Sequence, residues 1–428
     1  MQSNALCDFL KQAVTPYHAT AKIMQILTEN GFSVLREDRA WSLAVGGKYV
    51  VTRGSSALIA FVLPKEAERA PFHIAAAHND TPCFRITGEV HDGHYVRLTV
   101  EKYGGMMTGT WFDRPLAIAG RVFVRTNEGA RECLFESDAR LVIPSVAIHQ
   151  NTEANERVWG NPSVDMLPIF SRDFGGCALK MHIAEVLGVK EEDILSEELY
   201  LVSAEEPFVF GGDFLTAPRL DDLQCVFGLL SGLLEAAPAG AIPVLAVHDG
   251  EEVGSGTVQG ADSTFLSDTL FRIREALGAT VEQARALLAD SFMISADNAH
   301  AVHPAHPELS AKGLSCHMGG GIVIKENASR RYTSDGYSVA LLRLLCERAE
   351  VGIQCFRARA DRGCGSTLGH IANTHVSVPT VDIGLAQLAM HSAVETASLS
   401  DTDALVRAAK AFFSSRKLEN NGVIYWQS

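Results

Sequence analysis

The chain has 428 residues, a length at which two or three domains are the ordinary expectation. Hydrophobic residues make up 47% and charged residues 21%, which excludes disorder as the main state and provides for a large core. With 37 Lys and Arg against 51 Asp and Glu, the net charge is −14, so neither nucleic acid nor an anionic membrane is expected as a partner.

The first part of the chain predicts two helical stretches followed by buried strands. Apolar spacing over residues 4–27 predicts helix, broken at Pro16. Short apolar runs at 58–63 and 72–77, each bounded by turn residues, predict buried strands.

The pattern changes between about residues 85 and 202. Alternating runs such as 95–100 and 119–124 lie between glycine-rich turns, which is typical of antiparallel β structure.

After Pro218 the chain returns to alternating helices and apolar strands. Helices are predicted over 220–236, 269–288 and 338–348, and strands over 242–247, 292–296 and 378–383. The fold predicted is α/β, a mixed, mostly parallel sheet sandwiched by helices. We therefore predict one α/β domain from residues 1–86 plus 220–428, with a β-rich insertion at 87–219.

The cysteines and the absence of long apolar runs in the sequence indicate the cellular compartment of the protein. Nine cysteines are scattered, odd in number and contain no CxxC, which favours reduced thiols. No apolar run is long enough to span a membrane, and the first residues lack the features of a leader peptide. A cytoplasmic protein is expected.

Several predicted strands lead directly into histidines and carboxylates. In open α/β sheets ligands bind beyond the carboxyl ends of the strands, so residues far apart in sequence can meet in one cleft. An imidazole and carboxylate set without thiolate favours a catalytic zinc site, with manganese or cobalt as alternatives. If one carboxylate bridges, each of two metals has three protein ligands and room for a shared water. The candidate ligands are His78, Asp221, Glu252, Asp297 and His391.

Two further acidic residues have candidate roles. Of the adjacent pair Glu251 and Glu252, one can bind metal while the other takes a proton from bound water. Asp80, two residues after His78, could hold the free N–H of the imidazole. Taken singly, each of these residues has a capping, core or surface role as its alternative, whereas the whole pattern indicates a metal site.

The chain also carries a set of motifs in a familiar order. They are AAHNDTPCFRI (76–86), IPSVAIHQN (143–151), APRLDDLQC (217–225), DGEEVGSGTVQGA (249–261), ISADNAHAVHP (294–304), IVIKENASRRYTS (322–334), CGSTLGHI (364–371) and DIGLAQLAMHS (382–392). In these motifs the sequence resembles the aspartyl aminopeptidases, a family of dinuclear zinc metallopeptidases, over almost its whole length.

The resemblance implies roles for the ligands and the base. His78, Asp221 and Asp297 would bind one zinc, and Asp221, Glu252 and His391 the second, with Asp221 bridging. Glu251 would be the general base that activates the shared water and then protonates the leaving amine.

The resemblance to the aspartyl aminopeptidases also implies an assembly and a substrate. The insertion would form a dimer, six dimers would form a tetrahedral dodecamer, and His149 would reach the active site of a neighbouring subunit. Lys325 and Tyr332 match the positions that receive the side-chain carboxylate of an N-terminal Asp or Glu. From the sequence alone, an ordinary solvated lysine is the alternative for Lys325.

The sequence departs from the family pattern at three positions. Asp222 and Gly250 stand where the family usually has Asn, and His370 replaces an expected Pro. The function expected is hydrolysis of the first peptide bond of peptides that begin with Asp or Glu. The alternatives are a broader or glutamyl dinuclear aminopeptidase on the same scaffold, or a catalytically silent oligomeric shell protein.

Overall fold

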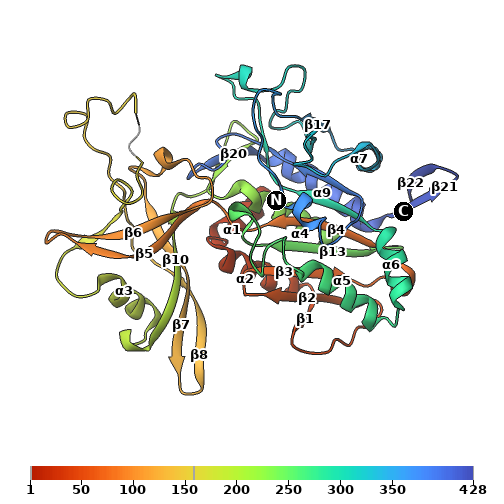
Figure 1. Cartoon of the computed structure of the whole chain (residues 1–428), viewed down its shortest axis with the longest axis horizontal. Coiled ribbons are helices and arrows are strands. Elements are labelled where there is room, and N and C mark those ends of the chain that lie inside the picture. Colours follow the sequence, from red (N-terminus) through yellow and green to blue (C-terminus); the bar gives the residue numbers. More distant parts are fainter. Residues whose placement is uncertain (1, 158–159, 428) are drawn as a thin grey trace.

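The computed structural model describes residues 2–157 and 160–427. A nine-stranded sheet covered by helices lies beside a smaller antiparallel sheet (Figure 1). In spatial order the large sheet contains β1 (Ser33–Leu35), β2 (Lys48–Arg53), β3 (Ala57–Val62), β13 (Ile242–His248), β4 (Phe72–His78), β14 (Phe292–Ala296), β18 (Thr380–Gly384), β16 (Ile322–Lys325) and β17 (Ile353–Phe356).

The centre of the large sheet is parallel. Strand β4 pairs in parallel with β13 on one side and with β14 on the other, and β14 pairs in parallel with β18. Antiparallel pairs occur between β2 and β3, β3 and β13, and β18 and β16. Because the four central strands run the same way, their carboxyl ends share one edge of the sheet.

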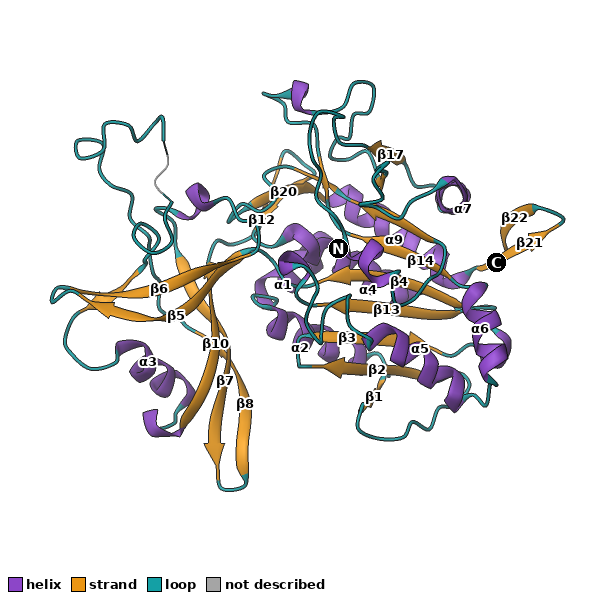
Figure 2. Cartoon of the chain, viewed as in Figure 1, coloured by secondary structure: helices purple, strands orange, loops and turns teal. Residues whose placement is uncertain are grey.

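Helices cover both faces of this sheet, because its central strands carry apolar residues on both sides (Figure 2). Alternate residues of β4 show this: Ala75 and Ala77 pack into one core, and Ile74 and Ala76 into the other. The first face is covered by α1 (Gln2–Gln12), α2 (Pro16–Glu29), α4 (Leu220–Glu235), α7 (Gly336–Arg348) and α9 (Leu399–Ser414). The second is covered by α5 (Phe265–Ala276), α6 (Val281–Ala289) and α8 (Leu368–Ala372).

One predicted helix, over residues 269–288, is wrong as a single element. The chain forms α5 and α6 with a turn between them, where Gly278 has a φ of 76°. That positive φ suits glycine and ends the first helix. Thr280 then begins the second helix through a reciprocal capping arrangement with Gln283.

The second sheet is formed by the segment predicted as an insertion. Its strands, all antiparallel, are β8 (Gly129–Glu136), β7 (Leu116–Thr126), β10 (Ile194–Ser203), β5 (Cys83–His91), β6 (Tyr95–Tyr103) and β9 (Ile169–Arg172). Helix α3 (Ala178–Leu187) packs on it through Leu179 and Ile183. The strand bounds differ by several residues from the predicted 87–219, because β5 begins at Cys83 and β10 ends at Ser203.

Three small sheets complete the chain. Strands β11 (Phe208–Phe210) and β12 (Phe214–Ala217) join β20 (Glu395–Ser398), which ties the end of the predicted insertion to the carboxyl-terminal part of the chain. The others are β15 (Ala299–His300) with β19 (Ala386–Gln387), and β21 (Arg416–Asn420) with β22 (Val423–Gln427). Among the described residues, no helix combines the length and the apolar character that crossing a membrane requires.

Candidate active site

The five candidate ligands meet at the carboxyl edge of the large sheet. His78 is the last residue of β4, and Asp297 directly follows β14. Glu252 lies in the short 3₁₀ turn after β13, and Asp221 lies at the start of α4, where its backbone is not helical. His391 lies in the loop between β19 and β20. The parallel register of the central strands brings together the first three of these residues, and the start of α4 and the loop between β19 and β20 add the other two.

The ligand atoms form two groups that share Asp221. His78, Asp221 and Asp297 have ligand atoms within 4.8 Å of one another, and so do Asp221, Glu252 and His391. The distance from His78 Nε2 to Asp221 Oδ1 is 3.6 Å, and that from His391 Nε2 to Asp221 Oδ2 is also 3.6 Å. The two oxygens of one carboxylate thus face different imidazoles, as a bridging ligand requires.

Glu251 lies within the same cluster of carboxyl groups. Together with His78 and Glu252 it forms a third group whose ligand atoms lie within 4.8 Å of one another. Burial raises the pKa of Glu251 to about 8, and it raises that of Glu252 to about 7 and that of Asp297 to about 6. Carboxyl groups held this close and away from water disfavour one another's charge, so a divalent cation between them is strongly favoured.

Asp80 organises the site through more contacts than the sequence predicted. Its carboxylate accepts the backbone N–H groups of Glu251 and Glu252, each at 3.0 Å, and the hydroxyl of Tyr103 at 2.9 Å. The imidazole Nδ1 of His78 lies 2.9 Å from the backbone carbonyl of Asp80 and 3.4 Å from its carboxylate. Asp80 therefore fixes both the histidine ring and the turn that carries the glutamate pair.

Two residues of the site were missed by the sequence analysis. The buried carboxylate of Glu395 accepts the backbone N–H groups of Asp221 at 3.0 Å and of His391 at 2.7 Å. The backbone carbonyl of Gly105 lies 2.8 Å from His391 Nδ1. A carboxylate four residues after His391 was the local signal for Glu395, and nothing in the sequence pointed to a carbonyl just after β6.

A pocket of about 520 Å³ connects the ligand cluster to the candidate substrate residues. Lys325, the last residue of β16, is buried, and its Nζ lies 3.5 Å from Asp297 Oδ2 and 5.6 Å from the centre of the Tyr332 ring. Burial alone would lower the pKa of Lys325, but Asp297, Tyr332 and Asp221 raise it above its usual value. An ammonium and a phenol therefore line the same pocket as the carboxylate cluster.

His149 lies apart from this pocket within the chain. It is exposed, in a turn of the segment between β8 and β9, and is not among the residues that line the pocket. Its role toward a neighbouring subunit stays a prediction.

Comparison with known proteins assigns the family. The sequence profile of the aminopeptidase I zinc metalloproteases (M18) matches residues 9–413. The chain belongs to the M18 family. A curated relative of this M18 chain, the probable M18 family aminopeptidase 2 of Clostridium acetobutylicum, is 39% identical over 429 residues, which cover 96% of this chain and 98% of the relative.

Solved structures give the same result for the fold. A chain in the cryo-EM structure of the Ape4 and Nbr1 complex is 32% identical to this chain, with a TM-score of 0.91. The match covers 96% of this chain and 84% of that chain. A subunit of the S. cerevisiae mApe1 dodecamer is 25% identical with a TM-score of 0.82, and the match covers 96% of this chain and 95% of that subunit. The α/β fold of the M18 chain is thus that of solved M18 aminopeptidases.

The residues of this M18 chain fit the zinc that its family binds. The cluster offers imidazole nitrogens and carboxylate oxygens and no thiolate, a donor set found in catalytic zinc sites. Asp221 Oδ1 is buried and has no hydrogen-bond partner within the part of the chain that the structure describes. A buried carboxylate oxygen left without a donor is costly, and a cation shared with His78 would satisfy it.

Glu395→Gln is expected to weaken zinc binding by the M18 chain about 10- to 100-fold, the usual effect of altering a group that positions metal ligands. The amide keeps one acceptor oxygen and cannot accept both backbone N–H groups that Glu395 holds. Zinc titration with a competing chelator measures the change. The exposed Glu419→Gln is the matched control, and equal zinc affinity in the two variants would remove Glu395 as a positioning residue.

The three departures from the family pattern have defined places. Asp222 is buried, and its Oδ2 accepts the backbone N–H of His78 at 3.3 Å. Gly250 has a φ of 78°, so glycine fits the turn that starts the glutamate pair. His370 lies in α8, with Nδ1 2.7 Å from the carbonyl of Thr367. None of the three displaces a candidate ligand from the cluster.

Proposed function

We propose that this M18 zinc aminopeptidase removes an N-terminal Asp or Glu from peptides. The observation that supports this best is the buried Lys325 in the pocket that also contains the ligand cluster. A short acidic side chain in this pocket would place its carboxylate near the ammonium and the phenol of Tyr332. A neutral side chain would leave Asp297 as the one ion-pair partner of Lys325 within 4 Å among residues 2–157 and 160–427.

The residues of the cluster have distinct roles in the proposed reaction. His78, Asp221 and Asp297 would hold one zinc, and Asp221, Glu252 and His391 a second. Two bound ions would lower the pKa of water and polarise the scissile carbonyl.

Glu251 has the acid–base role. It takes the proton from the water whose oxygen attacks the scissile carbonyl carbon, and it returns that proton to the amine as the C–N bond breaks. Asp80 supports this role because it binds the backbone N–H of Glu251 and so fixes the turn.

Lys325→Met is expected to reduce the preference for Asp over Leu at the amino terminus about 100-fold, because the variant keeps the length of the side chain and loses the charge that pairs with the substrate. The measurement is kcat/KM for Asp-, Glu-, Leu- and Lys-anilides with zinc-loaded enzyme. The exposed Lys312→Met is the control, since it loses the same charge outside the pocket.

The anilide series also separates the alternatives. If the unmodified enzyme cleaves the Leu-anilide faster than the Asp-anilide, a broad-specificity aminopeptidase is favoured. If it cleaves the Glu-anilide and not the Asp-anilide, a glutamyl aminopeptidase is favoured. Failure to cleave any N-terminal residue after zinc loading would favour a silent shell protein. The joint presence of five ligands, a base and a pocket argues against the last.

We also propose a cytoplasmic homo-oligomer, a dimer that assembles to a dodecamer. The mApe1 relative is a dodecamer, and all nine cysteines of this chain are unpaired, as expected in a reducing compartment. In such a dimer the exposed His149 is proposed to steady the oxyanion in the partner's active site.

A subunit-mixing experiment tests the role of His149. His149→Ala and Glu251→Gln are each expected to be inactive, and refolding the two together should restore activity, because a mixed dimer combines one intact base with one intact histidine. Random pairing predicts roughly a quarter of the normal number of active sites. If the mixed sample has the mass of the native dimer and is still as inactive as the separate variants, His149 does not act in the neighbouring active site.

A further inference from the structure

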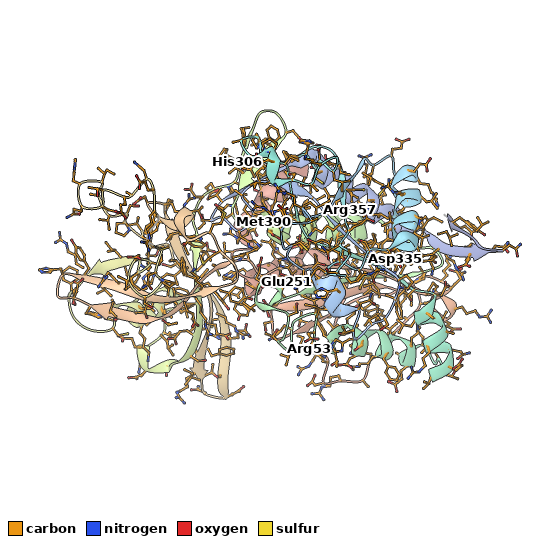
Figure 3. All side chains as sticks on the ribbon, turned by 45° about the horizontal axis from the view of Figure 1, so that its top comes forward. Arg53, Glu251, His306, Asp335, Arg357 and Met390 are labelled. Carbon is orange, nitrogen blue, oxygen red and sulfur yellow. The ribbon has the colours of Figure 1, made fainter. Side chains whose placement is uncertain are left out.

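A second pocket adjoins the pocket that contains the ligand cluster. It has a volume of about 390 Å³, and four residues line both pockets: His300, Phe356, Gly365 and Met390. In Figure 3, Glu251 marks the first pocket, Met390 the shared wall and Arg357 the second pocket. The two pockets are therefore neighbours with a common boundary.

The two linings differ in charge. Four carboxyl groups and one ammonium, that of Lys325, line the first pocket; the carboxyl groups are those of Asp221, Glu251, Glu252 and Asp297. The second is lined by three arginines, by two histidines and by no aspartate or glutamate among the described residues. In a protein with a net charge of −14, three guanidinium groups around one cavity are a marked local reversal. We call this cavity the arginine pocket, defined by Arg357, Arg359 and Arg362.

Hydrogen bonds fix two of the arginines in place. Arg357 donates from Nε and Nη2 to Glu326 Oε2, at 3.1 and 2.7 Å. Arg359 donates to the carboxylate of Asp361 and to the backbone carbonyl of Glu308. The bond to Glu308 joins the loop after β15 to the loop after β17. These two loops and residues 387–390 line the pocket.

The third arginine lies outside these two ion pairs, although the charge of Asp361 also acts on it. Arg357 pairs with Glu326 and Arg359 pairs with Asp361, whereas Arg362 has no ion pair within 4 Å in the described ranges 2–157 and 160–427. Its side chain is exposed at the pocket. Three guanidinium groups, one of them exposed and outside the close ion pairs, make a cavity suited to an anionic side chain.

We propose that the arginine pocket binds the carboxylate of an Asp or Glu at the second or third position of the peptide. This rests on the proposed aminopeptidase function, in which the first residue lies beside Lys325. An extended peptide advances about 3.3 Å per residue, so its second and third residues leave the first pocket within a short distance. The enzyme then favours peptides that are acidic beyond the residue it removes.

The experiment compares peptide amides that share the same first residue. They are Asp-Ala-Ala-Ala, Asp-Glu-Ala-Ala, Asp-Ala-Glu-Ala and Asp-Lys-Ala-Ala, all with a C-terminal amide. For the zinc-loaded enzyme, kcat/KM is expected to be about two- to five-fold higher with Glu at the second or third position than with Ala, the range typical of exposed charge pairs. Lys at the second position is expected to lower it, and added salt should reduce both differences.

Variants assign the effect to the pocket. Arg362→Gln, alone and with Arg357→Gln, is expected to bring the ratio of the Glu to the Ala peptides close to one, and Arg362→Lys to retain the preference. Arg285→Gln, which removes an exposed arginine of α6 outside the pocket, is the control. Equal rates for Glu and Ala peptides in the unmodified enzyme, or a ratio unchanged in both arginine variants, would overturn the proposal.

A last pair of substrates separates the sources of the carboxylate. If Asp-Ala with a free C-terminus is favoured over Asp-Ala-amide while internal Glu has no effect, the pocket binds a C-terminal carboxylate and the side-chain proposal fails. The proposed function is tested separately, by Asp-Glu-Ala-Ala against Leu-Glu-Ala-Ala. Equal rates for that pair would contradict the preference for an acidic first residue and leave the test of the arginine pocket intact.

Discussion

Glu251→Gln is expected to lower kcat by about 10²- to 10⁴-fold, the usual contribution of a positioned general base. The amide has nearly the shape of the carboxylate, and the backbone N–H of residue 251 can still bind Asp80. The five candidate ligands are untouched, so zinc content should remain normal. Steady-state kinetics on an Asp-anilide and elemental analysis of the purified variant measure the two properties.

The control for this variant is Glu282→Gln, an exposed glutamate in the first turn of α6. It should retain both activity and zinc. Because Glu251 also falls within ligand distance of His78 and Glu252, zinc analysis decides between its two possible roles. An inactive variant that has lost zinc would make Glu251 a ligand, and a fully active variant would remove it from the chemistry.

Asp221→Asn is expected to abolish the binding of both ions and to lower activity more than about a thousandfold. The reason is that Asp221 belongs to both proposed ligand sets: one set also contains His78 and Asp297, and the other contains Glu252 and His391. Thermal unfolding provides a second readout. Zinc should raise the Tm of the unmodified protein, since it binds the folded state, and should have little effect on the variant.

Asp8→Asn, an exposed change in α1, is the matched control and should retain the zinc-dependent rise in Tm. A variant of Asp221 that loses one zinc ion and keeps the other would show that the carboxylate serves a single ion. Normal content of both ions would contradict a bridging role altogether.

The ends of the strands and the candidate ligands could be predicted from the sequence because each is marked by a few neighbouring residues. An apolar run such as 72–77, followed at once by His78, predicts both a buried strand and a polar residue at its end. Parallel pairing then dictates that the ends of β4, β13 and β14 meet. The position of Asp297 near His78 follows from this topology and from no property of the two residues themselves.

The remaining features depend on contacts between distant segments. Glu395 and Gly105 act through a carboxylate and a carbonyl that bind backbone or ring N–H groups, and such acceptors have no sequence pattern of their own. The break at Gly278 was visible as a glycine, but only its positive φ shows that one helix ends there. The sequence predicted Asp80 as a partner of His78, whereas its contacts with Glu251, Glu252 and Tyr103 required the fold.

The second sheet contributes directly to the chemistry of the first. Gly105 lies just after β6 and orients His391, and Tyr103 at the end of β6 binds Asp80. At Gly104 a side chain would meet Glu252, with a Cβ only 3.0 Å from that of the glutamate. Deleting the antiparallel segment and joining its flanks would therefore leave all five candidate ligands in the polypeptide and still disable the enzyme. The smaller sheet is in this sense part of the scaffold of the metal site and not a separate appendage.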